Sequence, residues 1–321
     1  MPGAIVDQQG FVVLDGGLAT ELEARGESLN DPLWSAKILI TAPERIGDVH
    51  HAYFVAGADV GTTASYQATF EGLRDAGLRR DQAEEVMRRS VTVALEARDR
   101  FWNQLENRIG RFRPLIAASV GPYGAFLHDG SEYTGNYGGV SLDALKAFHR
   151  ERLALLSESG ADLLACETIP SLLEAKALIA LLNEFPQLPA WMSFICKDDA
   201  HLSNGTKFID AVSLAAESPS VVAIGLNCTA PHLVNSLLEK AKAITEKPLV
   251  VYPNSGEYYD STTRSWRFTS KVGMIETSAR GWYERGARFI GGCCRTTPET
   301  IRGIRSALTG ANPAIAGSGN S

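Results

Sequence analysis

The sequence predicts an α/β fold, a single-domain (β/α)8 barrel of the TIM type. Eight short apolar segments alternate with segments of helical period along most of the 321 residues, which suits a closed barrel better than an open doubly wound sheet. The apolar segments are nearly continuous, as in Leu115–Val120, and this is typical of parallel strands that are covered on both faces. No Gly-x-Gly-x-x-Gly motif follows the first predicted strand, which argues against a dinucleotide-binding fold.

Three glycines mark joints between a predicted helix and the strand that follows it. The sequence Gly-Ala, an ionisable residue and an apolar residue recurs at Gly57, Gly160 and Gly286. Glycine commonly ends helices because it adopts the left-handed backbone conformation at little cost. The eight predicted strands are Phe11–Gly17, Asp59–Ser65, Pro114–Gly121, Asp162–Thr168, Ala190–Cys196, Val221–Cys228, Pro248–Asn254 and Ala287–Cys294.

The segments between the strands have the spacing of amphipathic helices. Residues predicted to share one helix face are Val86, Ser90, Val93, Ala97 and Phe101 after residue 80, and Leu178, Leu181 and Leu182 after Pro170. The last helix should begin at Thr297-Pro298, with threonine as the N-cap and proline at the first helical position. We expect residues 1–310 to form the barrel domain and residues 311–321 to form a flexible C-terminal tail.

Two of the loops after predicted strands are long and aromatic. Residues 121–139 carry Tyr123, Phe126, Tyr133 and Tyr137, and residues 254–271 carry Tyr258, Tyr259 and Trp266. Loops of this length commonly bind or cover a ligand, and in such barrels the active site lies at the carboxyl ends of the strands. The alternative is that these aromatic side chains only pack on the rim of the barrel.

Composition excludes several classes of protein. The formal charge of −6 and the absence of a Lys/Arg block argue against a nucleic-acid partner or an anionic membrane surface. No apolar run approaches the roughly 18 residues needed to span a bilayer, and the N-terminal residues lack a signal-peptide pattern. An odd count of five cysteines favours a reducing compartment over a disulfide scaffold. We therefore expect a cytoplasmic protein without a membrane partner.

Three of the cysteines fall where the barrel should carry its chemistry. Cys228 ends the sixth predicted strand, and Cys293 and Cys294 end the eighth. Their spacing matches no zinc finger, and three thiolates from separate strands favour a catalytic Zn²⁺ with one open coordination position. A disulfide within the vicinal pair would close a strained ring. Cys166 and Cys196 lie inside apolar strands, where cysteine usually behaves as a small hydrophobic residue.

Such a zinc site would suit alkyl transfer to sulfur. Zn²⁺ with three thiolates carries a net charge of about −1, so it is a weak Lewis acid toward carbonyl groups. It can still bind and deprotonate a fourth thiol, whose free pKa is about 8.5. A zinc hydrolase is disfavoured on these grounds, and none of the six histidines shows the partners of a catalytic or metal-binding site. A zinc-binding barrel without catalysis stays open.

Six motifs resemble those of the homocysteine S-methyltransferase family. They are Asp15–Gly17, Ser65–Thr69, Ser119–Gly124, Glu167–Pro170, Gly225–Cys228 and Gly291–Thr297. The resemblance extends from about Val12 to Leu308. Gly130–Tyr137 and Val251–Glu257 are similar to the branch of the family that uses S-methylmethionine. The barrel expected from the strand pattern is also the fold that this resemblance implies.

The resemblance implies a reaction and a metal. Cys228, Cys293 and Cys294 would hold zinc, and the thiolate of homocysteine would attack the methyl group of a sulfonium donor. The donor would be S-methylmethionine or S-adenosylmethionine, and the product methionine. Betaine as donor and selenocysteine as acceptor are alternatives. No cobalamin module is expected, because that route needs domains beyond one barrel.

The resemblance also suggests substrate-binding residues. Asp15 and Glu167 would pair with the homocysteine ammonium, although Asp15 could instead cap the first strand-to-helix turn. Asn227 would shape the metal-binding loop or donate a hydrogen bond to substrate. Ser65 and Tyr66 complete the predicted set, and Tyr66 could face the sulfonium through cation–π attraction of about 0.5–2 kcal/mol or simply pack in the core.

Overall fold

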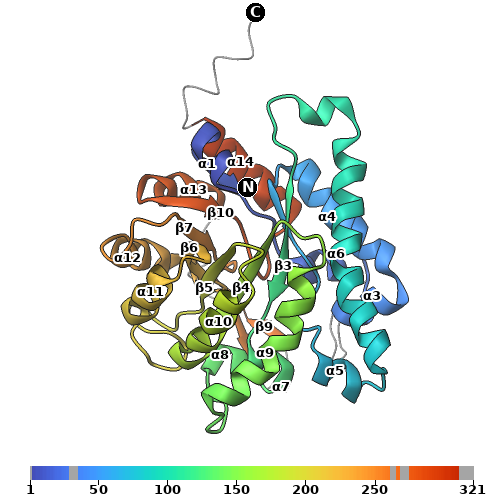
Figure 1. The fold of residues 1–321 in the computed structure, drawn as a ribbon. Helices are drawn as coiled ribbons and strands as arrows, with labels where there is room; N and C mark the ends of the chain where they lie inside the picture. The colour runs from blue at the N-terminus through green and yellow to red at the C-terminus, as the bar shows by residue number, and fades with distance from the viewer. Residues whose placement is uncertain (1, 29–34, 261–264, 268–274, 311–321) are drawn as a thin grey trace, which may run out of the picture.

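A computed structural model describes residues 2–28, 35–260, 265–267 and 275–310. Eight parallel strands lie at its centre with helices around them (Figure 1). These strands are β1 (Val12–Val13), β2 (Val60–Thr62), β3 (Leu115–Val120), β4 (Leu163–Ile169), β5 (Ala190–Phe194), β6 (Val221–Asn227), β7 (Leu249–Tyr252) and β10 (Ala287–Ile290). Their order is β1-β10-β7-β6-β5-β4-β3-β2, and a parallel bridge between Leu14 and Val60 joins the two outer strands. The predicted (β/α)8 barrel is therefore confirmed.

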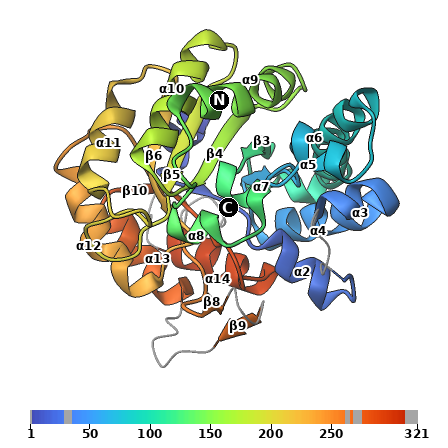
Figure 2. The ribbon, with the colours of Figure 1, turned by 90° about the horizontal axis from the view of Figure 1, so that it is seen from below.

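Helices alternate with the strands along the chain and lie around the barrel and at its two ends (Figures 1 and 2). In the first half of the chain they are α1 (Pro2–Gln9), α2 (Leu18–Ala24), α3 (Ser35–Thr41), α4 (Pro43–Ala56), α5 (Phe70–Asp75), α6 (Arg80–Trp102), the 3-10 helix η1 (Leu105–Arg108), α7 (Tyr123–Leu127), α8 (Ser131–Thr134) and α9 (Leu142–Ser157). They continue with α10 (Leu172–Glu184), α11 (Phe208–Glu217), α12 (Pro231–Lys242), α13 (Ile275–Glu284) and α14 (Pro298–Thr309). None of the helices in the described ranges is long and apolar enough to cross a membrane.

Apolar side chains pack in two layers. One cluster fills the barrel interior and includes Val12, Val60, Trp191 and Phe289. Ile5 of α1 belongs to this inner cluster, so α1 closes the amino-terminal end of the barrel. A larger cluster lies between the strands and the surrounding helices. Burying both faces of each strand removes the need for alternation between polar and apolar residues, and this explains the continuous apolar runs.

The predicted helix patterns are confirmed. Every residue of the predicted face on α6 is buried, as are the three leucines of α10. The glycines at the predicted joints have positive φ angles of 120° at Gly57, 88° at Gly160 and 102° at Gly286. Helix α14 begins at Pro298, with Thr297 as its N-cap residue.

Both long loops contain regular structure that was not predicted. Residues 121–139 form the short helices α7 and α8. Within residues 254–271, β8 (Tyr258–Asp260) pairs with β9 (Ser265–Arg267) as an antiparallel hairpin. The side chains of Tyr258, Tyr259 and Trp266 and the predicted tail, 311–321, lie outside the described part of the chain.

Candidate active site

A pocket opens at the carboxyl ends of the barrel strands, the end that faces the viewer in Figure 2. Its volume is about 880 Å³, counting the part open to solvent. The carboxyl ends of β2 and β4 line it, together with the segments that follow β1, β2, β6 and β10, Tyr252 of β7 and two residues of α8. The polar or sulfur-bearing side chains of this lining belong to Asp15, Thr20, Thr62, Thr63, Tyr66, Gln67, Glu132, Tyr133, Glu167, Thr168, Cys228, Tyr252, Cys293 and Cys294.

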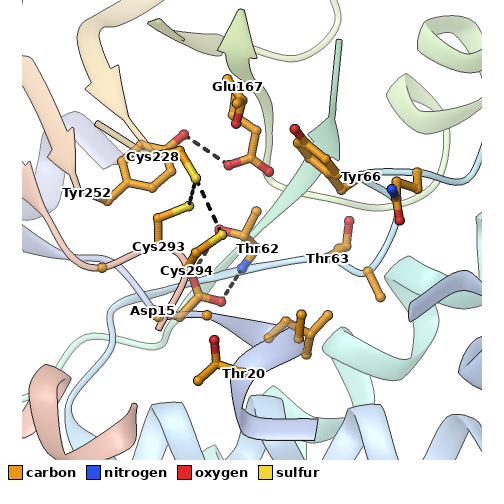
Figure 3. A pocket seen from close by; sticks show the side chains of 18 of the residues that line it. Asp15, Thr20, Thr62, Thr63, Tyr66, Glu167, Cys228, Tyr252, Cys293 and Cys294 are labelled. Carbon is orange, nitrogen blue, oxygen red and sulfur yellow. Dashed lines mark hydrogen bonds between the residues drawn. The ribbon is translucent and has the colours of Figure 1, made fainter. Parts of the chain in front are cut away.

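The three cysteines predicted as metal ligands converge in this pocket (Figure 3). The Sγ atom of Cys228 lies 3.1 Å from that of Cys293 and 3.4 Å from that of Cys294. All three sulfur atoms lie within 4.8 Å of one another. Strand β6 delivers Cys228, and strand β10 delivers the vicinal pair through Gly291 and Gly292.

Glycine is required at both positions before the vicinal pair. A Cβ atom on Gly291 would lie 2.6 Å from the Cβ atom of Leu14, and one on Gly292 would lie 2.3 Å from Thr296 Oγ1. Any larger side chain would push the chain after β10 away from β1. The Gly-Gly sequence therefore lets the segment with Cys293 and Cys294 lie close against the barrel.

The donor set fits a zinc ion. Three thiolates at about 2.3 Å from a tetrahedral zinc would have sulfur atoms about 3.8 Å apart, close to the separations between these thiols. Hydrogen bonds from Cys228 and Cys293 hold the pKa of Cys294 well below its usual value. Hydrogen bonding to the other two thiols raises the pKa of Cys228. The hydrogen bonds among the thiols thus favour one thiolate, and a divalent cation would favour all three.

Asp15 and Glu167 both line the pocket (Figure 3). Asp15 accepts hydrogen bonds from the backbone N–H of Thr62 at 2.7 Å and from its hydroxyl at 3.0 Å. Glu167 accepts one from the hydroxyl of Ser119 and one from Tyr252 at 3.1 Å. Burial raises the pKa of Asp15 to about 8 and that of Glu167 to about 7. A bound cation would lower the pKa of both carboxyl groups and stabilise their charged forms.

The other predicted substrate residues are placed differently. Tyr66 lines the pocket, whereas Ser65 and Asn227 are fully buried behind its surface. The Ser65 hydroxyl donates to the Ser119 carbonyl at 2.7 Å. The Asn227 amide contacts Thr168, Ser193 and Cys293, so its hydrogen-bonding groups are directed into the barrel and toward the metal-ligand loop.

Sequence reasoning missed Glu132 of α8. This residue lines the pocket, is 8% exposed, and its Oε2 atom has no hydrogen-bond partner among the described residues. Burial raises its pKa to about 7. The pocket thus presents three carboxyl groups, and within the described ranges no lysine, arginine or histidine lines it. The sequence feature that could have indicated this residue is its position as the acid within the aromatic and glycine-rich segment 130–137.

A model of the family described as homocysteine S-methyltransferase matches residues 12–308. The chain belongs to the homocysteine S-methyltransferase family. It is 54% identical over 300 residues to homocysteine S-methyltransferase YbgG of Bacillus subtilis, covering 94% of this chain and 95% of that protein. It is 46% identical to homocysteine S-methyltransferase 2 of Arabidopsis thaliana, covering 93% of each chain.

A solved structure of a family member has the same fold. The metallated form of the homocysteine methyltransferase MmuM from Escherichia coli aligns with a TM-score of 0.86 at 45% identity, covering 95% of this chain and 99% of that one. Fold, family and relatives agree that this chain is an enzyme that methylates the sulfur of homocysteine.

Proposed function

We propose that this enzyme takes its methyl group from a sulfonium compound and that it prefers S-methylmethionine to S-adenosylmethionine. We also propose that Cys228, Cys293 and Cys294 hold a zinc ion. The observation that carries the proposal is the convergence of three thiols in a pocket with three carboxyl groups and, among its described lining residues, no basic side chain. Such a pocket favours cationic ligands. Homocysteine and S-methylmethionine bring two ammonium groups and one sulfonium.

Zinc, when bound, would lower the pKa of the homocysteine thiol and keep the resulting thiolate nucleophilic. The chain's own residues then have two tasks, to orient the substrates and to exclude water. Asp15 and Glu167 would accept the homocysteine ammonium, because both are buried acids beside the thiol cluster. Tyr66 would present its ring to the donor's sulfonium.

The transfer itself needs no general acid from the protein. A bond forms between the homocysteine sulfur and the methyl carbon while the bond from that carbon to the donor sulfur breaks. The electron pair of the broken bond stays on the donor sulfur, which leaves as a neutral thioether. Alignment of the three reacting atoms would supply most of the rate enhancement.

Donor comparison tests this proposal. Zinc-loaded enzyme would be given homocysteine with S-methylmethionine, S-adenosylmethionine or betaine, and methionine would be measured by mass spectrometry. We expect the highest kcat/KM with S-methylmethionine, a lower value with S-adenosylmethionine and none with betaine. Turnover with betaine alone, or full turnover after removal of zinc by a chelator, would overturn the proposal.

A second acceptor deserves the same assay. A selenocysteine Se-methyltransferase of Brassica oleracea is 46% identical to this chain, covering 93% of it and 89% of that protein. We propose that selenocysteine is a secondary acceptor, because its selenolate forms at lower pH than a thiolate. Methylselenocysteine should appear with S-methylmethionine as donor, and its absence at saturating selenocysteine would refute this extension.

A further inference from the structure

Glu132 is a buried acid to which the reaction described above gives no task. It lies in α8, its side chain is 8% exposed and it faces the pocket. The other two pocket acids, Asp15 and Glu167, accept hydrogen bonds from neighbouring side chains. Glu132 Oε2, in contrast, has no hydrogen-bond partner in the part of the chain that the structure describes. A buried carboxylate oxygen without a donor is costly, and a bound ligand would remove that cost.

The backbone around Glu132 is firmly held. A Cβ atom on Gly124 of α7 would lie only 2.4 Å from the backbone nitrogen of Glu132, so the two short helices approach as closely as glycine permits. Asp129 accepts a hydrogen bond from the backbone N–H of Ser131 at 2.9 Å. Buried Glu174 accepts hydrogen bonds from the Tyr123 backbone N–H and the Tyr137 hydroxyl, both at 2.6 Å. These contacts hold the backbone from which the Glu132 side chain projects into the pocket.

Glu132 lies within electrostatic reach of the two pocket tyrosines. Burial raises the pKa of Tyr66 well above 10, and the charges of Glu132 and Cys228 raise it further. Tyr133 also has a raised pKa, through burial and then through the charges of Cys294 and Cys228. The tyrosines therefore connect the surroundings of the thiols with those of Glu132. A short amino acid could place its sulfur near the thiols and its other end near Glu132.

We propose that Glu132 binds the α-ammonium group of the methyl donor and so selects a donor that is an amino acid. A sulfonium centre carries no N–H, so it cannot donate to the orphaned oxygen, whereas an ammonium group donates three hydrogen bonds. The homocysteine ammonium is assigned to Asp15 and Glu167, which leaves the donor's ammonium for Glu132. This inference rests on the proposed function, because it takes S-methylmethionine as the donor.

The test is the variant Glu132→Gln, which removes the charge and keeps the shape. At saturating homocysteine, its KM for S-methylmethionine should rise by about 10- to 100-fold, the loss expected for a charge-assisted hydrogen bond in a buried site. The zinc content and the KM for homocysteine should stay unchanged. The inhibition constant of 2-amino-5-methylhexanoate, which replaces the sulfonium by a neutral CH group, should rise by the same factor.

Two further variants make the test specific. Asp143→Asn removes a charge from an exposed position in the first turn of α9, outside the pocket, so its donor KM should match that of the wild type. Glu132→Asp keeps the charge but shortens the side chain, so its KM should lie between those of the wild type and Glu132→Gln.

Other results would overturn the assignment. If Glu132→Gln weakens the binding of S-methylmethionine but not that of its neutral analogue, the carboxylate contacts the sulfonium instead of the ammonium. If zinc or homocysteine affinity falls as much as donor affinity, Glu132 has a structural role. An unchanged donor KM would refute the inference and leave the proposed function intact. If wild-type enzyme fails to use S-methylmethionine, the proposed donor is wrong and the inference falls with it.

Discussion

Asn227 of β6 and Thr168 of β4 are joined by two hydrogen bonds, although β5 lies between these two strands in the sheet. The Asn227 Oδ1 atom accepts from the Thr168 backbone N–H at 2.7 Å, and Nδ2 donates to Thr168 Oγ1 at 2.7 Å. Thr168 has a φ of 60°, a conformation that is costly for a β-branched residue. The same amide nitrogen lies 3.9 Å from Cys293 Sγ. One side chain therefore supports both the left-handed backbone at Thr168 in β4 and a thiol of the predicted metal site.

Replacing Asn227 should weaken metal binding without removing a ligand. Asn227→Ala deletes the N–H donor beside Cys293 and leaves the Thr168 N–H buried without its acceptor. We expect a 10- to 100-fold loss in zinc affinity, measured by competition with a chelator, and about 1–3 kcal/mol less stability. Asn183→Ala, at an exposed position on α10, is the control. Unchanged zinc affinity in Asn227→Ala would show that the amide does not support the site.

Removing one thiol should abolish the metal site. Cys294→Ala leaves two thiols, so the protein should lose its zinc on dialysis. Its activity should fall by at least about a hundredfold, more than the loss of a residue that only supports a metal ligand would cause. Cys196→Ala removes a buried thiol that does not line the pocket and should keep both zinc and activity. Zinc content by mass spectrometry separates the two variants. Full zinc retention by Cys294→Ala would remove this cysteine from the ligand set.

Asp15 should make the stability of the substrate-free protein depend on pH. Burial raises the pKa of Asp15 from 3.8 to about 8, so the folded state favours the protonated acid. Its contribution to stability is fully present below about pH 4 and is lost as the pH rises toward 8. Asn at this position does not titrate. The melting temperature of Asp15→Asn relative to wild type should therefore rise between pH 5 and pH 8.

Two measurements complete the Asp15 test. Asn183→Ala, which removes no ionisable group from an exposed position on α10, should show no comparable trend with pH. The KM of Asp15→Asn for homocysteine should increase, because the substrate ammonium loses a partner. A pH-independent difference in melting temperature between Asp15→Asn and wild type would contradict a raised pKa for Asp15.

Gly124 tests whether the packing of α7 against α8 positions Glu132. The Cβ atom of Gly124→Ala would meet backbone atoms of Ser131 and Glu132 at 2.6 Å and 2.4 Å, so α8 must move. We expect a higher KM for S-methylmethionine and little change in zinc content. Gly3→Ala, where an added Cβ meets nothing within 4 Å, is the matched control. A wild-type donor KM in Gly124→Ala would show that the position of α8 is not critical.

The barrel could be predicted because its strands have a recognisable pattern of apolar residues in the sequence. Continuous apolar runs such as Val221–Leu226 reflect strands buried on both faces, and glycines at helix ends mark where three of the eight strands begin. Apart from β4, which ends at Ile169, the observed strands are shorter than predicted at their polar ends. For example, β1 stops at Val13, and Asp15–Gly17 leave the sheet to line the pocket. The thiol cluster was also predictable, because carboxyl ends of parallel strands meet at one face of a barrel.

Other parts of the site carry no pattern that a single sequence reveals. Helix α8 has four residues, about one turn, which is too short for an amphipathic period. From the sequence alone, Glu132 therefore cannot be distinguished from an acidic residue of a surface loop. Only the packing of α8 against Gly124 places it in the pocket. Ser65 and Tyr66 are neighbours in one predicted motif, but only Tyr66 lines the pocket. The direction of each side chain is set by the turn after β2.

The most direct test of the proposed methyl transfer follows both substrates in one reaction. Zinc-loaded enzyme would receive homocysteine with a deuterated backbone and S-methylmethionine with two deuterated methyl groups. The masses of the products would be measured by mass spectrometry. We expect equal amounts of two methionines, one with a deuterated backbone and a deuterated methyl group and one with an unlabelled backbone and a deuterated methyl group. Neither should form after zinc removal. A methionine pool without the heavy backbone, or undiminished product in the chelated enzyme, would contradict it.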